Sequence, residues 1–306
     1  SKIVSDAETP TLNDVAWGLT NPDVGRVFFP FLKFGNWKLD DRGRALENAW
    51  RRKIGDVSLS AWSRGVKDAY RPALIFNSTF AETGEPLLFA TSNLTYSPSV
   101  KIEEKTAHRK TFFAEFAGHD IKIVTAARLA ASFPFVTPAA RPLKGGAAYH
   151  QVDGGYYDNY GLSSLMAWLA EALDQRAANN PKPEILVLQI RSFPEDEIPD
   201  AKWKTWFYQV YAPFDGLESV RVTGQLLRDK EELRSFEDSR RDKAAFCNVT
   251  FGFPGASAPL SWQLNRSQKQ AVKDQWSSQA DNLNKVQRFL DPPAGSSRPV
   301  CNDEPQ

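Results

Sequence analysis

The passage that most constrains the fold runs from residue 149 to residue 190. A short extended segment, "YHQVD", ends at Asp153 and is followed by two glycines. The segment "EILVLQI" farther on is almost continuously apolar, as in a strand that is buried on both faces. Between them, apolar residues recur at the spacing of a helix, at Leu162, Leu165, Met166, Leu169 and Leu173. Strand, helix and strand in this order form a parallel crossover unit, so the sequence predicts a layered α/β domain.

Upstream of this passage the sequence predicts a helix, two neighbouring strands, and a strand that leads into a short helix. Asp40 or Asp41 can cap a helix that extends to about Lys53. Its residues at core spacing are Ala45, Leu46, Ala49 and Trp50. The runs "PALIFNST" and "PLLFATSN" flank the turn "AETGEP", which predicts adjacent strands. Residues 121–124 resemble a strand, and the Ala-rich helix after them must stop near Pro134.

Downstream of the crossover the chain is mostly helical. Residues from about 200 to 246 form an amphipathic stretch rich in both signs of charge, which we interpret as a helical insertion with a solvated face. One more strand, "CNVTFGF", and two helices, within "SWQLNRSQKQAVKDQW" and "ADNLNKVQRFL", close the fold. The predicted organisation is an irregular segment over 1–40, a domain over 41–290 that includes the insertion, and a disordered tail over 291–306.

The composition excludes several classes of function. The chain has 38 Lys plus Arg and 37 Asp plus Glu, so its net charge of +1 gives no general attraction to nucleic acid or anionic membranes. It contains neither a G-x-x-x-x-G-K-[ST] phosphate loop nor a G-x-G-x-x-G fingerprint. Its histidines and its two cysteines, Cys247 and Cys301, form no metal-ligand pattern. We therefore predict no metal, no cofactor and no nucleic-acid partner, while a single disulfide stays open.

Asp153 is the candidate reactive residue. Reactive groups of parallel α/β sheets gather where strands end, and the two glycines let the backbone turn sharply behind the carboxylate. The carboxylate is then a general base or the orienting partner of a nucleophile, or else it merely caps the turn. His150 lies three residues earlier on the predicted strand and points to the opposite face, so we expect no Ser-His-Asp triad.

The residues that follow Asp153 carry predictions of their own. Asp158 and Asn159 are interpreted as N-terminal caps of the next helix. Half of the eight tyrosines fall between residues 149 and 160, where they either line a pocket or pack the corner between strand and helix. They are Tyr149, Tyr156, Tyr157 and Tyr160.

Several segments together resemble a known family. The segment "VDGGYYDNYG" is similar to the aspartate motif of the patatin-like acyl hydrolases, in which D-G-G or D-G-A supplies the aspartate of a Ser-Asp dyad. "TAARLAASFPFVTPA" resembles the family's Ala/Ser-rich helix and the Phe-Pro turn after it. "PLLFATSNL" and "PLSWQLNRSQKQAVKDQW" resemble segments of bacterial members, so the resemblance covers roughly residues 40–290.

The resemblance implies a three-layer α/β fold with a mainly parallel central sheet and helices on both faces. It implies hydrolysis of acyl esters in lipids, of the phospholipase A or lipase type, with Asp153 as catalytic residue and Gly154 and Gly155 as its motif turn. The residues that we expect in a substrate pocket are Phe133, Phe135, Tyr156 and Tyr157. Peripheral membrane contact is a further expectation, and the apolar passage at 27–37 is either a loop packed on the body or a lipid-facing lip.

One departure from the family pattern is large. The family also has a glycine-rich oxyanion loop and a G-x-S-x-G turn that presents the serine, and both precede the segments matched here. None of the eighteen glycines begins a G-x-S-x-G motif, and the "KGGA" sequence at 144–147 lacks the arginine of the oxyanion loop. The chain therefore resembles the carboxy-terminal part of the family domain. We expect an upstream segment of the same protein to carry the serine, so this chain alone would be inactive.

Two other classes of function stay open at this stage. Without an upstream serine, the chain would be a non-catalytic lipid-binding or regulatory module. A glycoside hydrolase would pair Asp153 with a second carboxylate about 5–9.5 Å away, and would use some of the nine tryptophans as sugar platforms. The sequence does not decide the cellular compartment.

Overall fold

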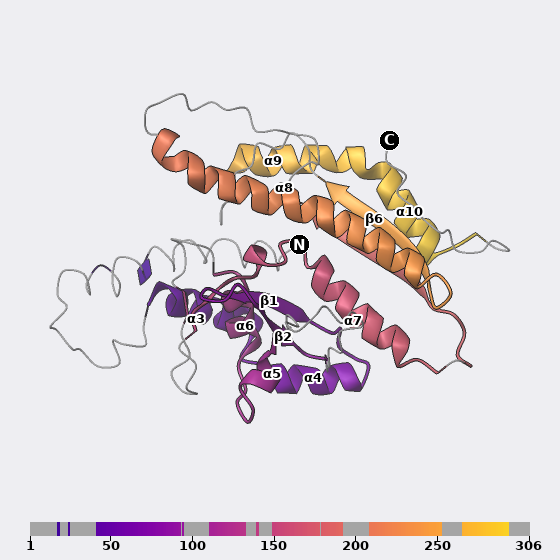
Figure 1. The fold of residues 1–306 in the computed structure, drawn as a ribbon, viewed down its shortest axis with the longest axis horizontal. Coiled ribbons are helices and arrows are strands. Elements are labelled where there is room, and N and C mark those ends of the chain that lie inside the picture. Colours follow the sequence, from indigo (N-terminus) through magenta and orange to yellow (C-terminus); the bar gives the residue numbers. More distant parts are fainter. Residues whose placement is uncertain are drawn as a thin grey trace. The chain divides into compact units, whose positions relative to one another are not determined.

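The computed structural model describes residues 17–18, 24, 41–92, 94, 110–132, 139–140, 149–177, 179–191, 208–252 and 265–293, the side chains of 208–223 excepted. The chain divides into two compact units, residues 1–164 and residues 165–306. Figure 1 shows that each unit combines helices with strands. The chain is therefore a mixed α/β protein.

The first unit contains a four-stranded mixed sheet. Its strands, in the spatial order β3-β2-β1-β4, are β1 (Ile75–Phe80), β2 (Pro86–Ala90), β3 (Lys110–Thr111) and β4 (Gln151–Asp153). β1 and β2 form an antiparallel hairpin in which Ile75 lies opposite Ala90, so the adjacent strands predicted from the two apolar runs are confirmed. β4 runs antiparallel to β1, whereas β3 runs parallel to β2.

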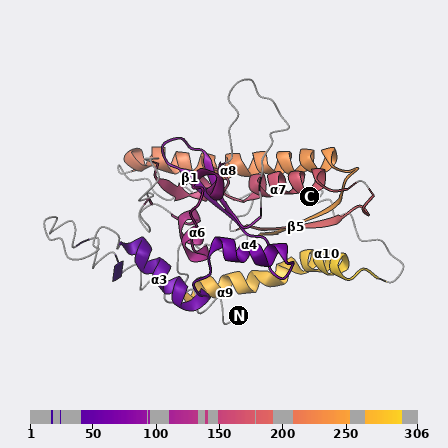
Figure 2. The ribbon, with the colours of Figure 1, turned by 90° about the horizontal axis from the view of Figure 1, so that it is seen from below.

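The described part of the first unit also contains helices. They are α3 (Arg42–Ile54), α4 (Leu59–Lys67), α5 (Phe112–Glu115) and α6 (Ile123–Ala130). Of these, α3 packs against α6. Asp41 caps α3 by accepting a hydrogen bond from Arg44 N–H at 2.8 Å, as predicted. α6 lies beside β1 (Figures 1 and 2). The core that joins α4, α5 and α6 to β1 and β2 consists of Leu59, Phe80, Leu87, Phe89, Phe112, Ile123, Ala126 and Leu129.

The strand predicted over residues 121–124 is wrong, because helix α6 begins at Ile123. Strand-like pairing is limited to an isolated bridge between Lys122 and Ser58. From Ile123 onward, the buried residues Ile123, Val124, Ala126 and Leu129 follow a helical spacing. Burial of this face overrides the preference of β-branched residues for strands, which is weak compared with tertiary packing.

The helix predicted between the two strands is present as α7 (Leu162–Asp174). It follows β4 and a short 3₁₀ helix, η2 (Gly154–Tyr156). Leu162, Met166, Leu169 and Leu173 are buried, which confirms the helical spacing of the apolar residues. The strands on either side of α7, β4 and β5 (Glu184–Arg191), belong to separate sheets among the described residues, so the parallel crossover unit stays a prediction.

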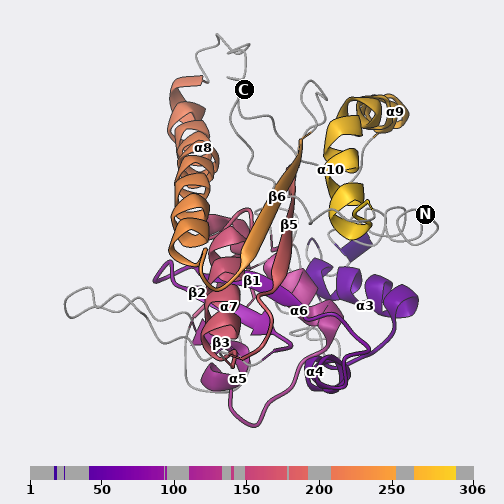
Figure 3. The ribbon, with the colours of Figure 1, turned by 90° about the vertical axis from the view of Figure 1, so that its right-hand side faces the viewer.

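The second unit is built on two parallel strands, β5 (Glu184–Arg191) and β6 (Ala245–Gly252), paired along their whole length. Its helices are α8 (Tyr208–Ser239), α9 (Arg266–Asp274) and α10 (Ala280–Leu290), with a 3₁₀ turn η3 (Gln275–Gln279) between the last two. α8 and α10 lie on opposite sides of the strands (Figure 3). The helical stretch predicted near 200–246 is confirmed over residues 208–239, while residues 200–207 lie outside the described residues. The strand after it and the two closing helices are confirmed.

Alternate residues of β6 point to different helices of the second unit. Phe246 packs with Leu169 and Leu173 of α7, whereas Val249 and Phe251 pack with Phe289 of α10. The fully buried Cys247 of β6 is disulfide-bonded, and Cys301, the one other cysteine of the sequence, lies outside the described residues.

Strand β5 is not buried on both faces, contrary to the prediction from its apolar sequence. Leu188 is 51% exposed and Ile190 is 79% exposed, whereas Val187, Gln189 and Arg191 between and beside them are buried. Among the described residues, β5 pairs with β6 alone. The face that carries Leu188 and Ile190 is covered only in part, by the cluster of Phe289 in which Leu186 takes part, whereas parallel strands are normally covered on both faces.

Some predictions lie outside the described residues. These are the greater part of the segment 1–40, including the passage at 27–37, the tail from 294 to 306, and two of the expected pocket residues, Phe133 and Phe135. The described strands form one mixed and one parallel sheet, so a single mainly parallel central sheet stays a prediction. Among the helices that the structure describes, none has the length and apolar character needed to span a membrane.

Candidate functional site

Asp153 is the last residue of β4 and stands opposite Ser78 of β1 in the sheet register. Its backbone N–H donates to Ser132 O at 3.2 Å. Its carboxylate oxygen Oδ1 accepts a hydrogen bond from Gly155 N–H at 2.7 Å. Both the backbone and the carboxylate are thus held, and the capping interpretation of Asp153 is confirmed. Because a carboxylate accepts about four hydrogen bonds, this cap is compatible with a second role as base.

The two glycines after Asp153 lie in restricted space, Gly154 against backbone and Gly155 against the ends of two side chains. A Cβ on Gly154 would lie 2.2 Å from Asn77 O, a backbone atom of β1. A Cβ on Gly155 would lie 2.6 Å from Asn159 Oδ1 and 2.8 Å from Asp153 Oδ1. Any side chain at Gly155 would therefore displace the Asp153 carboxylate. The Gly-Gly pair brings the turn against β1 and keeps the carboxylate in place.

Asp158 caps α7, as the sequence predicts. Its side chain is 4% exposed and accepts hydrogen bonds from Ser164 N–H at 2.9 Å and from Ser164 Oγ at 2.7 Å. Its own N–H donates to Gly154 O at 2.9 Å, which closes the turn. Asn159, the second predicted cap, lies with its amide oxygen over Gly155.

Asn77 belongs to the site, although the sequence reasoning did not single it out. Its Nδ2 donates to Asp158 O and to Asp158 Oδ2, each at 3.4 Å. Its Oδ1 is buried without a hydrogen-bond partner among the described residues. The signal in the sequence was an amide in the middle of an apolar strand, a position where Asn is disfavoured.

Ser78 and Ser132, whose backbones lie against Asp153, have structural roles. Ser78 is fully buried, and its Oγ donates to Val152 O at 3.0 Å. Ser132 is 3% exposed, and its Oγ donates to Arg128 O at 3.0 Å. Because a nucleophile must reach its substrate, neither hydroxyl is a candidate partner for Asp153.

The tyrosines of this region divide between two environments. Tyr149 packs against Phe80 with ring centroids 5.3 Å apart, so it fills the core beside the strands. Tyr156 is 42% exposed and Tyr157 is half-buried, both within or next to the η2 turn. Their role in a pocket stays a prediction, since Phe133 and Phe135 lie outside the described residues.

His150, at the other end of β4, pairs with Glu82 and not with Asp153. Its Nδ1 lies 2.5 Å from Glu82 Oε1, and its backbone N–H donates to Glu82 Oε2 at 2.8 Å. The hydrogen bond from the His150 side chain lowers the pKa of Glu82 below its ordinary value. His150 is thus an exposed residue at the strand end.

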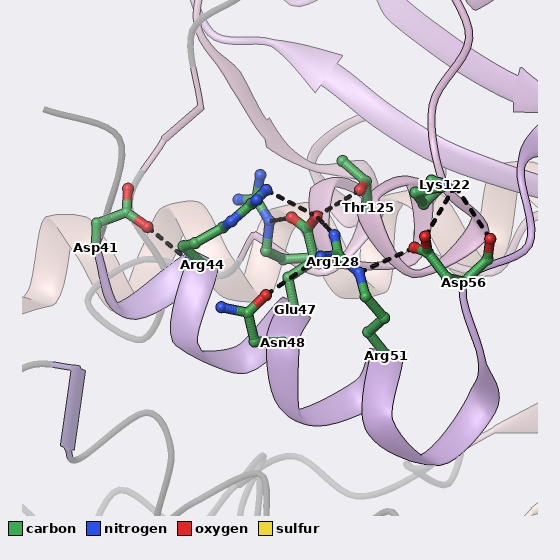
Figure 4. Close-up of polar contacts among 9 residues, drawn as sticks. All are labelled: Asp41, Arg44, Glu47, Asn48, Arg51, Asp56, Lys122, Thr125 and Arg128. Carbon is green, nitrogen blue, oxygen red and sulfur yellow. Dashed lines mark hydrogen bonds and ion pairs between the residues drawn. The ribbon is translucent and has the colours of Figure 1, made fainter. Parts of the chain in front are cut away.

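A buried carboxylate fixes the helix that leads to the site. Glu47 of α3 is 3% exposed and accepts hydrogen bonds from Thr125 Oγ1 at 2.6 Å and from Arg128 Nε at 3.1 Å, both on α6. Arg51 Nη2 contacts the same carboxylate at 3.2 Å (Figure 4). Ser132, just beyond α6, then carries the carbonyl that receives Asp153 N–H. The Glu47 network therefore positions the backbone behind Asp153.

Within the described residues, no group of three or more histidine, cysteine, aspartate or glutamate side chains is arranged to hold a metal ion.

Comparison with known proteins adds no relative to this description. No protein-family model matches the chain, and the searches of curated proteins and of solved structures also find no match.

Proposed function

We propose that the chain is the carboxy-terminal part of a patatin-like acyl hydrolase with a three-layer fold, and that Asp153 is the aspartate of its Ser-Asp dyad. The substrates are acyl esters of lipids. The observation that carries the proposal is the fixed geometry at Asp153: a strand end, a carboxylate held by Gly155 N–H, and a glycine, Gly154, at which any side chain would clash with the backbone of Asn77.

In this mechanism the serine hydroxyl attacks the ester carbonyl while the Asp153 carboxylate accepts the hydroxyl proton. Backbone N–H groups of a glycine loop stabilise the oxyanion, and the loss of one such donor typically costs about 2.7–4 kcal/mol. The proton then passes to the leaving alcohol, and water releases the acyl group from the serine. The described residues supply the base of this scheme.

An upstream segment of the same protein supplies the serine and the oxyanion loop. Ser78 and Ser132 are buried in structural hydrogen bonds and do not provide the nucleophile. Among the described strands, β5 pairs with β6 alone, so its other edge can accept a further strand. In hydrolases that use G-x-S-x-G, the serine sits between a strand and a helix, so a segment that brings the serine also brings a strand.

The test is chemical labelling of the full-length protein with a serine-reactive fluorophosphonate, followed by peptide mapping. We expect one labelled serine, located before residue 1 of this chain. A label inside residues 1–306 would reject the missing nucleophile. Absence of any label, together with binding to lipid vesicles, would favour the non-catalytic lipid-binding module instead.

The carboxylate of Asp158, beside the turn, does not support the glycoside hydrolase alternative. Both side-chain oxygens of Asp158 accept hydrogen bonds from backbone N–H groups of Ser163 and Ser164, and the residue is 4% exposed. A carboxylate used in this way caps a helix and is not available as an acid or a base for a sugar.

A further inference from the structure

We propose that Asn77 is a positioning residue for Asp153: it holds the glycine turn and the start of α7 in the arrangement that presents the Asp153 carboxylate. The inference rests on the proposed Ser-Asp dyad. It assigns a function to a residue of β1 that is distant in sequence from the D-G-G motif.

The first observation is that the turn packs directly on the backbone of Asn77. A Cβ on Gly154 would meet three atoms of Asn77, at 2.2 Å from O, 2.5 Å from C and 2.7 Å from Cβ. The next residue of β1, Ser78, stands opposite Asp153 in the sheet. The path of β1 at these two residues therefore fixes both Asp153 and the residue after it.

The second observation is that the side chain of Asn77 reaches the other end of the same turn. Its Nδ2 contacts the carbonyl and the carboxylate of Asp158. Asp158 in turn holds Ser164 at the start of α7 and donates its N–H to Gly154 O. A single residue thus touches the beginning of the turn through its backbone and the end of the turn through its amide.

The third observation concerns Asn77 Oδ1, which is buried without a hydrogen-bond partner among the described residues. An unsatisfied buried acceptor is unfavourable, and a β-branched apolar residue would suit the middle of this strand better. Strand stability alone therefore does not account for the amide. The contacts of Nδ2 with Asp158 do account for it, because Val or Ile could not make them.

The neighbouring strand residue Thr79 provides a matched control. It lies two residues farther along β1 and so on the same face as Asn77. It is 3% exposed, and its Oγ1 also has no hydrogen-bond partner among the described residues. Thr79→Val keeps the shape of the side chain and removes a hydroxyl that has no hydrogen-bond partner among the described residues.

The experiment measures kcat and KM for a p-nitrophenyl acyl ester, and the rate of fluorophosphonate labelling, in the full-length protein. For Asn77→Ala we expect kcat and the labelling rate to fall about 10- to 100-fold while KM changes by less than about threefold, because misplacement of a catalytic group acts on the chemical step. Ser164→Ala, which weakens the far end of the contact, should lower kcat less. Thr79→Val should leave kcat and KM unchanged.

Circular dichroism and the melting temperature of each variant separate positioning from unfolding. If Asn77→Ala does not fold, the same measurements of kcat, KM and labelling rate on Asn77→Ser test the inference. An unchanged kcat in a folded Asn77 variant, alongside an inactive Asp153→Asn, overturns this inference and leaves the dyad standing. Full turnover in Asp153→Asn would remove the proposed function and this inference together.

Discussion

Arg128 Nε of α6 donates a hydrogen bond to the carboxylate of Glu47 on α3 at 3.1 Å, and both side chains are largely buried. The two residues are 81 positions apart in the sequence. Thr125 Oγ1 completes the contact from the same helix at 2.6 Å (Figure 4). This pair connects α3 to the helix whose end anchors the Asp153 backbone.

We predict that Glu47→Ala destabilises the first unit strongly, because it leaves Arg128 with a buried and uncompensated charge. Removal of one partner of a buried ion pair typically costs about 3–5 kcal/mol. Urea unfolding, followed by circular dichroism, measures the change in the free energy of unfolding. The control is Glu115→Ala, at an exposed glutamate of α5. Equal stability of the two variants would contradict the role given to Glu47.

Gly154→Ala should displace the turn, because the new methyl group would lie 2.2 Å from Asn77 O, which is a backbone atom and cannot rotate away. Overpacking of this kind costs about 1–3 kcal/mol. The melting temperature should fall, and ester hydrolysis in the full-length protein should fall with it. Gly224→Ala on α8 is the control, since a Cβ there meets nothing within 4 Å. A Gly154→Ala protein with wild-type stability would disprove the close packing.

Acid should weaken the second unit through Asp174. Hydrogen bonds from Lys243 and Arg240 lower the pKa of this carboxyl below its ordinary value of 3.8. The folded state therefore binds a proton less readily than the unfolded state. The resulting stability is present above the ordinary pKa and is lost as the pH falls through the lowered one.

The corresponding variant is Asp174→Asn. It should be less stable than the wild type at neutral pH, and the two proteins should converge once the pH has fallen below the lowered pKa of Asp174. Urea unfolding at neutral pH and at such a low pH measures the difference. Asp242→Asn, at an exposed aspartate of the turn before β6, is the control. A stability difference for Asp174→Asn that does not change with pH would contradict the ion-pair account.

Strand β5 should promote aggregation of the chain, because it combines an apolar sequence with exposed Leu188 and Ile190. Replacement of both residues by lysine should lower light scattering of concentrated solutions without lowering the melting temperature. The matched control is the double replacement of Leu227 and Leu290, which are 60% and 66% exposed on helices. Equal scattering of the two double variants would show that the strand has no special role.

Much of the local structure could be predicted from the sequence, because the relevant contacts lie within a few residues. The spacing of the leucines predicted α7, and the position of Asp153 before two glycines predicted the turn and its cap. Asn77 and Glu47 were missed, since their partners lie 81 residues away and no local pattern reports such a distance. The prediction of a strand over 121–124 was wrong for a similar reason, because the packing of Ile123 in the buried face of a helix outweighed its local preference for a strand.

The most direct test of the account is the turnover of Asp153→Asn in the full-length protein, with Asp120→Asn as a control at an exposed aspartate of the same unit. Asparagine keeps the shape of the side chain and can still accept from Gly155 N–H, but it cannot take the proton of a serine. We predict a folded protein whose ester hydrolysis is about 10²–10⁴-fold slower. Near-normal turnover of Asp153→Asn would contradict the catalytic role of Asp153.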